Sequence, residues 1–103
     1  MSIYRLTRQA EADLKDIYRS SQRTGSHAQA ARYAHQMQEC LELLIERPHT
    51  GTRREDLWSP NLYSFVYGSH VIFYQPQPYG VLIVRVLHDS QDVRRHLNDG
   101  ADL

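Results

Sequence analysis

YSFVYGSHVIFYQPQPYGVLIVRVLHDSQD, residues 63–92, contains three segments rich in β-branched and aromatic residues, with turn-forming residues between them. The pair Gly68-Ser69 between the first two segments is typical of a tight type II′ hairpin. Residues 76–80, PQPYG, predict a second, looser turn. The last segment, VLIVRVL (81–87), is apolar on both faces apart from one arginine, so we expect both of its faces to be covered.

The first half of the chain predicts a short strand at 3–6 and two helices. Thr7 is a candidate N-cap for the first helix, and Gly25 is expected to end it in a left-handed conformation. Ser26 and Gln29 have the spacing of a capping box for the second helix, which must end before Pro48. The short connection between the helices predicts an antiparallel helical hairpin.

The predicted element order is β-α-α-β-β-β. This order indicates an α+β fold, with the helical hairpin packed on one face of a small, mostly antiparallel sheet. We expect residues 49–60 to form a loop and residues 89–97 to form a last short helical turn. The whole chain, 1–103, is expected to be a single domain in which residues 98–103 form a frayed tail. Two helices cover only one face of such a sheet, so we expect a second polypeptide to cover the other face.

Composition narrows the possible functions. Twelve basic and twelve acidic residues cancel, so strong sequence-independent binding to nucleic acid by this chain alone is not expected. The single cysteine, Cys40, excludes an internal disulfide and fits a reducing compartment. The start of the chain has no apolar signal core, and no apolar run approaches about 18 residues. We therefore expect a cytoplasmic protein that makes no use of a membrane.

Six histidines raise the question of a metal site. His88, Asp92 and His96 are spaced four apart, so a continuing helix would align them on one face. Zinc sites need several convergent ligands with supporting contacts, however, and the chain is expected to change direction just after His88. We therefore expect no metal and no cofactor. His88 would instead form a hydrogen bond in the C-terminal turn, and Asp92 would cap that turn or pair with an arginine.

Arg85 is the most unusual charge in the sequence because it interrupts an apolar strand. In a regular strand it shares a face with Val81, Ile83 and Leu87. A charge at such a position must be paired or must meet water or a partner. Two interpretations are open: a salt bridge within the chain to an acid such as Asp89 or Asp92, or a groove that receives carboxylates from another protein.

The remaining candidates also have two interpretations. Arg53-Arg54-Glu55-Asp56 is a mixed charge cluster on the predicted loop, which is either simply solvated or part of a binding surface. The strand aromatics either pack across strands or form a platform on which bases stack; they are Tyr63, Phe65, Tyr67, Tyr74 and Tyr79. No catalytic triad, phosphate-binding glycine loop or paired-carboxylate spacing is present.

Several segments, taken in this order and spacing, resemble the ParE branch of the RelE/ParE toxins of bacterial type II toxin–antitoxin systems. The resemblance extends from about Ile3 to Leu97. The segments that carry it are AEADLKDIYRSSQRTG, QAARYAHQMQECLELLIERPHTGTRREDL, LYSFVYGSHVIFYQ and GVLIVRVLHDSQDVRRHL. The family fold is the β-α-α-β-β-β arrangement expected above.

The resemblance implies a ParD-like antitoxin whose C-terminal segment folds onto the toxin in a hetero-oligomer. It also implies a target, because ParE-type members block DNA gyrase whereas RelE-type members cut messenger RNA on the ribosome. The ribonucleases are strongly basic, and their arginine positions correspond to Val71 and Asp89 here. A terminal aromatic of the ribonucleases corresponds to Arg94 and Arg95.

We therefore expect a toxin that is not an enzyme and that inhibits DNA gyrase by protein binding. A ribosome-dependent endoribonuclease of the RelE class stays open as the alternative, and so does an antitoxin-binding module with little toxicity. An amphipathic helix or extended strand of the antitoxin is expected to lie across the helical hairpin and the open sheet face. The candidate residues for contacts with the antitoxin or the target are Arg53, Arg54, Tyr74, Arg85, His88 and Asp92.

Overall fold

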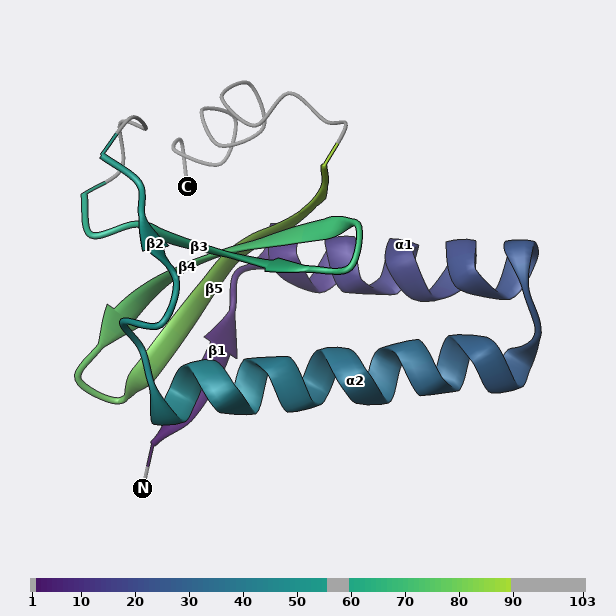
Figure 1. Ribbon diagram of the computed structural model, residues 1–103, viewed down its shortest axis with the longest axis horizontal. Coiled ribbons are helices and arrows are strands. Elements are labelled where there is room, and N and C mark those ends of the chain that lie inside the picture. The colour runs from purple at the N-terminus through teal and green to yellow at the C-terminus, as the bar shows by residue number, and fades with distance from the viewer. Residues whose placement is uncertain (1, 56–59, 90–103) are drawn as a thin grey trace.

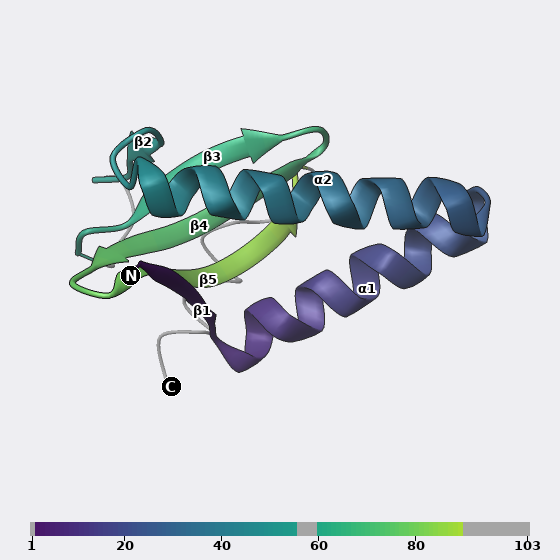
Figure 2. The ribbon, with the colours of Figure 1, turned by 90° about the horizontal axis from the view of Figure 1, so that it is seen from below.

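The computed structural model describes residues 2–55 and 60–89 and shows a two-layer α+β fold (Figure 1). The elements are β1 (Ile3–Leu6), α1 (Arg8–Thr24), α2 (His27–Glu46), β2 (Thr52–Arg53), β3 (Tyr63–Tyr67), β4 (His70–Gln77) and β5 (Gly80–His88). Both helices lie on the same side of the sheet (Figure 2). The predicted order and fold class are confirmed, and the predicted loop contains one further short strand, β2.

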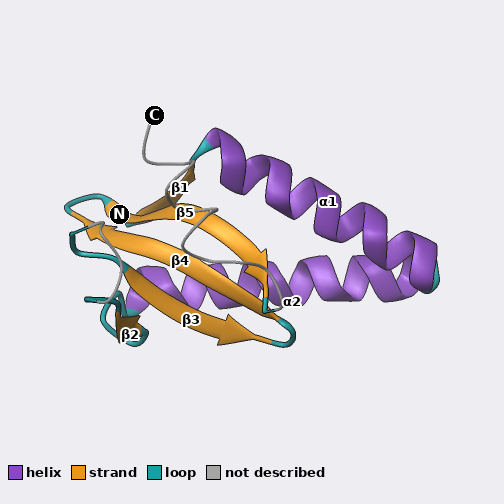
Figure 3. Ribbon diagram, turned by 90° about the horizontal axis from the view of Figure 1, so that it is seen from above, coloured by secondary structure: helices purple, strands orange, loops and turns teal. Residues whose placement is uncertain are grey.

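The sheet has the strand order β1-β5-β4-β3-β2 (Figure 3). β1 is parallel to β5, and each of the other neighbouring pairs is antiparallel. The first and last strands of the described chain are therefore neighbours in the sheet. At the other edge β2 covers only the beginning of β3.

Side-chain caps explain where the helices begin. Thr7 Oγ1 accepts the Ala10 N–H at 3.1 Å and donates to the Val84 carbonyl at 2.7 Å, so one hydroxyl starts α1 and fastens it to β5. Ser26 Oγ accepts the Gln29 N–H at 3.1 Å, which confirms the predicted cap of α2. The left-handed cap predicted at Gly25 is wrong, because its φ and ψ are −143° and −152°. Only two residues connect the helices, and both are extended so that Ser26 can cap α2 at once.

Glycines fix both hairpins. Gly68 has a φ of 59° whereas Ser69 has no positive φ, which is the pattern of the predicted type II′ turn. The second connection is tighter than predicted, because β4 continues through Gln77 and only two residues precede β5. Gly80 has a φ of 142°, and a Cβ at this position would overlap the carbonyl oxygen of Ile3. Glycine is therefore required here for β1 to lie beside β5.

The main core lies between the helices and the sheet. Its wholly buried members include Leu44 on α2, Tyr74 on β4 and Ile83 on β5. A second cluster lies on the outer face of the sheet, where Phe73 and Leu87 are also wholly buried. The expectation that a second polypeptide covers this face is wrong for these side chains, because they are already buried in the chain alone.

A β-bulge changes which side chains of β5 face the helices. Tyr74 on β4 pairs with Ile83, but the preceding residue, Phe73, pairs with Arg85, which leaves Val84 as the extra residue. After the bulge Val86 joins the helix-side core and Leu87 joins the outer cluster. The prediction that Arg85 shares a face with Val81, Ile83 and Leu87 is therefore wrong, since one extra residue reverses the alternation.

Two further predictions concern residues that the structure does not describe. The predicted helical turn through residue 97 and the predicted tail at 98–103 lie outside the described residues. Among those that are described, neither helix is both long and apolar enough to cross a membrane.

Candidate functional site

An apolar groove runs between the two helices and encloses about 200 Å³. The helices meet at their connection and separate toward the sheet (Figure 2). Small Ala30 and Ala34 on α2 leave space opposite Leu14 and Ile17 on α1, which forms the hollow. The groove is lined by Tyr4, Leu14, Ile17, Tyr18, Ala30, Tyr33, Ala34, Met37, Gln38 and Leu41. A groove of this composition can receive apolar side chains from a partner.

A polar aromatic cluster closes the groove toward the β3–β4 hairpin. The Tyr33 hydroxyl lies 2.5 Å from His70 Nδ1, and the Tyr33 ring lies 5.4 Å from the ring of Tyr67. The Tyr67 hydroxyl in turn donates to Gln36 Oε1 at 2.9 Å. Burial is the largest cause that raises the pKa of Tyr33 and of Tyr67, so both stay protonated near neutral pH. The hairpin is thus tied to α2 by hydroxyl groups.

A second, polar pocket of about 250 Å³ lies between α1, the start of β4 and the end of β5. His70 and His88 lie directly opposite each other in the register and make an edge-to-face contact with ring centroids 5.5 Å apart. Asp13, Asp16 and Ser20 line the same pocket from α1. Two adjacent imidazoles can donate and accept protons. The charged groups that α1 adds to this pocket are carboxylates rather than cations.

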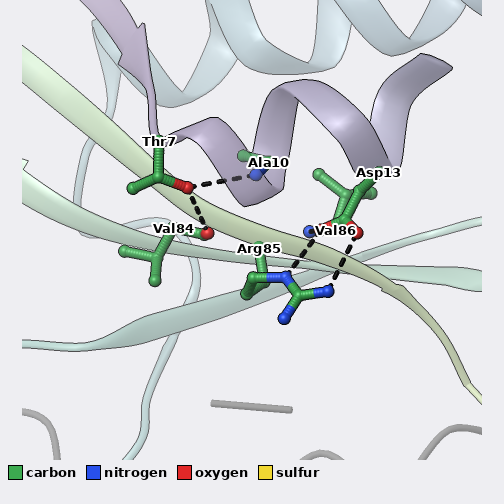
Figure 4. Close-up of polar contacts among 6 residues, drawn as sticks. All are labelled: Thr7, Ala10, Asp13, Val84, Arg85 and Val86. Carbon is green, nitrogen blue, oxygen red and sulfur yellow. Dashed lines mark hydrogen bonds and ion pairs between the residues drawn. The ribbon is translucent and has the colours of Figure 1, made fainter. Parts of the chain in front are cut away.

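Arg85 pairs with Asp13 of α1, an acid that the sequence did not indicate (Figure 4). Its Nε and Nη2 donate to the two carboxylate oxygens at 2.8 and 2.9 Å. The carboxylate also accepts the Val86 N–H at 2.9 Å. β1 pairs with β5 only as far as Ile83, so Asp13 takes the place of a neighbouring strand at Val86. The expected salt bridge within the chain is present, but the acid that the structure describes is Asp13, 72 positions away, and Asp92 lies outside the described residues.

Tyr74 on β4 and the two arginines of the predicted loop have different environments. Tyr74 is wholly buried, where its hydroxyl donates to the Pro48 carbonyl at 2.7 Å and accepts the Gly51 N–H at 2.9 Å. Arg54 lies over the ring of Phe73, with its guanidinium carbon 5.6 Å from the ring centroid. Arg53 is exposed, and its Nε lies 3.8 Å from a Glu55 carboxylate oxygen. Among the three residues, Arg53 is the most accessible to a partner.

The candidate residues therefore do not form one site. Arg53 lies opposite Tyr63 at the beginning of β3, whereas His88 lies opposite His70, beside the turn that follows β3 (Figure 3). His88 Nδ1 lies 3.1 Å from a carboxylate oxygen of Asp89. Asp92 lies outside the described residues. The structure brings His88 together with His70 and the carboxylates of α1.

Sequence reasoning missed Tyr33 and His70 as site residues. Both occur in ordinary helix and strand patterns, and only the tertiary fold places α2 beside the β3–β4 hairpin. The described part of the chain contains no group of three or more histidines, cysteines and acids arranged to hold a metal. Burial raises the pKa of the Cys40 thiol, which makes it a poor nucleophile.

Comparisons with known proteins agree with this fold. The profile of the family described as "ParE toxin of type II toxin-antitoxin system, parDE" matches residues 4–93. A protein named Toxin ParE1 from Caulobacter vibrioides is 41% identical over 97 residues, covering 94% of this chain and 99% of that protein. Toxin ParE1 from Mycobacterium tuberculosis is 30% identical and covers 93% and 98%. A structure titled "Chromosomal ParDE TA system from P. aeruginosa" has a TM-score of 0.69 at 19% identity, covering 85% of this chain and 96% of the other.

Proposed function

Because the chain belongs to the ParE toxins of type II toxin–antitoxin systems, we propose that a ParD-like antitoxin holds it inactive and that the free toxin inhibits DNA gyrase by binding. The observation that carries this proposal is the near-full-length identity of 41% to a protein named Toxin ParE1. Both the antitoxin and gyrase act in the cytoplasm, so the toxin would act there as well.

The apolar groove between the helices is the proposed binding site of the antitoxin. Its lining is aliphatic and aromatic, and Tyr18 at its rim is 37% exposed. An amphipathic helix or extended segment that places apolar anchors here would gain most of its affinity from them. Arg32 on α2 lines a neighbouring polar pocket and is exposed, so it is available to a carboxylate of the antitoxin.

Two matched substitutions on α2 test this binding site. Ala34 lines the groove and Ala31 does not, although both are exposed on the same helix. Ala34→Phe should fill the groove and weaken binding to the co-expressed antitoxin by about tenfold or more, because a central apolar anchor contributes about 2 kcal/mol or more. Ala31→Phe should leave the affinity measured by isothermal titration calorimetry unchanged. Equal effects of the two substitutions would place the antitoxin elsewhere.

The proposal that the toxin acts without catalysis is supported by its charge and by the sequence positions that differ from the ribonucleases. The chain has no net charge, and the ribonuclease arginine positions hold Val71 and Asp89. Antitoxin-free protein should inhibit the supercoiling activity of purified gyrase or trap cleaved DNA. No effect on supercoiling at a large excess of toxin would remove gyrase as the target. Harmless expression of the folded chain alone would favour an antitoxin-binding module with little toxicity.

One observation favours the alternative, a ribosome-dependent ribonuclease. His70 and His88 are adjacent imidazoles at the edge of a polar pocket, and two such groups can serve as acid and base. The acids of that pocket are unsuited to a pentacovalent phosphate, which cationic side chains stabilise. Toxin-dependent cuts within translated codons would establish the ribonuclease. Replication arrest with intact transcripts would exclude it.

A further inference from the structure

Tyr33 connects the apolar groove between the helices to the β3–β4 hairpin. Its ring lines the groove, and the same ring contacts those of Tyr67 and His70 with centroids 5.4 and 5.7 Å away. Its hydroxyl lies 2.5 Å from His70 Nδ1. A side chain that is held at both its ring and its hydroxyl has one preferred position, and that position sets the shape of this end of the groove.

The protonation state of His70 decides which hydrogen bond it can form with the Tyr33 hydroxyl. A neutral imidazole with an unprotonated Nδ1 accepts the tyrosine hydroxyl hydrogen. When Nδ1 carries a proton, the imidazolium must donate, and the hydroxyl hydrogen of Tyr33 has to turn toward another acceptor. Tyr33 lies between the apolar groove, Tyr67, whose hydroxyl donates to Gln36, and an open polar pocket on α2, so a hydroxyl that turned toward this pocket would give up its contact with His70. The neutral form of His70 therefore fits the arrangement better.

Taken together, the charged groups around His70 also favour its neutral form. Burial and the neighbouring His88 on β5 lower the pKa of His70, whereas Asp89 opposes this shift. From α1, Asp13 and Asp16 line the same pocket, but Asp13 is paired with Arg85, and the side chain of Asp16 is 78% exposed. The titratable groups of α2 and β3 that lie beside His70 are Tyr33 and Tyr67, which are neutral near pH 7.

We propose that His70 is a positioning residue for antitoxin binding: its neutral imidazole holds Tyr33 at the end of the helical groove, and a bound antitoxin segment selects this form. The inference rests on the proposed function, since it takes the groove as the antitoxin binding site. An antitoxin that covers the groove removes water from Tyr33, whose hydroxyl hydrogen then depends more on its acceptor at His70, and this disfavours the imidazolium. Binding is then linked to proton release and weakens as the solution becomes acidic.

The first experiment uses the isolated chain and does not depend on any partner. Long-range ¹H–¹⁵N correlation spectra report the tautomer of each histidine, and a titration between about pH 5 and 8 follows its protonation. We expect His70 to be protonated on Nε2 at neutral pH, and the Tyr33 ring signals to move together with the titration of His70. In His70→Asn the Tyr33 signals should no longer respond. Tyr33 signals that ignore the His70 titration in the wild type would overturn the proposal.

The second experiment measures the affinity of the co-expressed antitoxin at several pH values. Binding by the wild type should weaken by about tenfold for each unit by which the complex lowers the His70 pKa, once the pH is below that pKa. His70→Asn keeps an oxygen that accepts the Tyr33 hydroxyl, so it should bind with near-wild-type affinity at neutral pH and lose this dependence. His35→Asn is the matched control, because His35 is 72% exposed and its only described partner is Glu39 on the same helix; it should keep the dependence.

The two experiments distinguish a failure of the proposed antitoxin site from a failure of the proposed role of His70. If the antitoxin binds outside the groove, as the Ala34 and Ala31 substitutions would show, the proposed site fails while the spectra still test the contact between Tyr33 and His70. If the antitoxin binds in the groove with the same pH dependence in His70→Asn as in the wild type, the role of His70 is wrong and the proposed function stands.

Discussion

Asp13→Ala should be among the most destabilising single substitutions in this chain. The Asp13 carboxylate accepts two hydrogen bonds from Arg85 and one from the Val86 N–H, all between 2.8 and 2.9 Å. The two charged side chains are only 13% and 12% exposed. Removing one member of such a buried pair costs about 3–5 kcal/mol, because the bonds that offset the burial of the other charge are lost. An unsatisfied N–H alone contributes about 1–3 kcal/mol of such a loss.

Urea denaturation followed by circular dichroism measures this effect. For a small protein the free energy of unfolding falls by about 1–3 kcal/mol per molar urea, so the midpoint should move by about 1 M or more. Asp13→Asn keeps an oxygen for the Val86 N–H and loses only the charge, so its midpoint should lie between those of Asp13→Ala and the wild type. Asp16→Ala, one turn further along α1, is the control, because its side chain is 78% exposed and lies 4.0 Å from Arg19. This control should stay within about 0.5 kcal/mol of the wild type.

The outcome that would refute the reasoning is an Asp13→Ala midpoint equal to that of the Asp16→Ala control. Arg85→Ala supplies the complementary measurement and should lower the stability of the isolated chain for the same reason. If Arg85→Ala instead left stability unchanged and weakened only the antitoxin complex, Arg85 would act in partner binding, as one interpretation of the sequence suggested.

Three smaller effects should be visible in the same assay. Thr7→Val removes the cap of α1 and the bond to the Val84 carbonyl and should cost about 1–2 kcal/mol; no loss would show that water replaces both bonds. Tyr74→Phe should cost about 1–3 kcal/mol, since the Gly51 N–H loses its acceptor; a wild-type midpoint would contradict this. Because burial lowers the pKa of His70 from 6.5 in the folded chain, the unfolded chain takes up that proton first, so stability should be complete above about pH 6.5 and decrease below it. His70→Asn should reduce this decrease, and an unchanged pH profile would show that other groups cause it.

Local interactions explain what could be predicted of the fold. The caps Thr7 and Ser26 and the turn at Gly68 depend on atoms a few residues apart, so the sequence alone indicates them. Alternation and helical spacing indicate the strands and helices in the same way. Gly25 shows the limit of this reasoning, because the two-residue connection to α2 requires an extended backbone at a position where helix statistics favour a left-handed one.

The fold class, the family resemblance and the order of every described element except β2 could thus be read from local patterns in the chain. Three features depend on packing between distant segments: the pairing of Arg85 with Asp13, the reversal of β5 faces after Val84 and the contact between Tyr33 and His70. These features join residues 37 and 72 positions apart, or depend on one unpaired residue between two strands. No local pattern encodes them, because they follow from how α1, α2 and the sheet pack together.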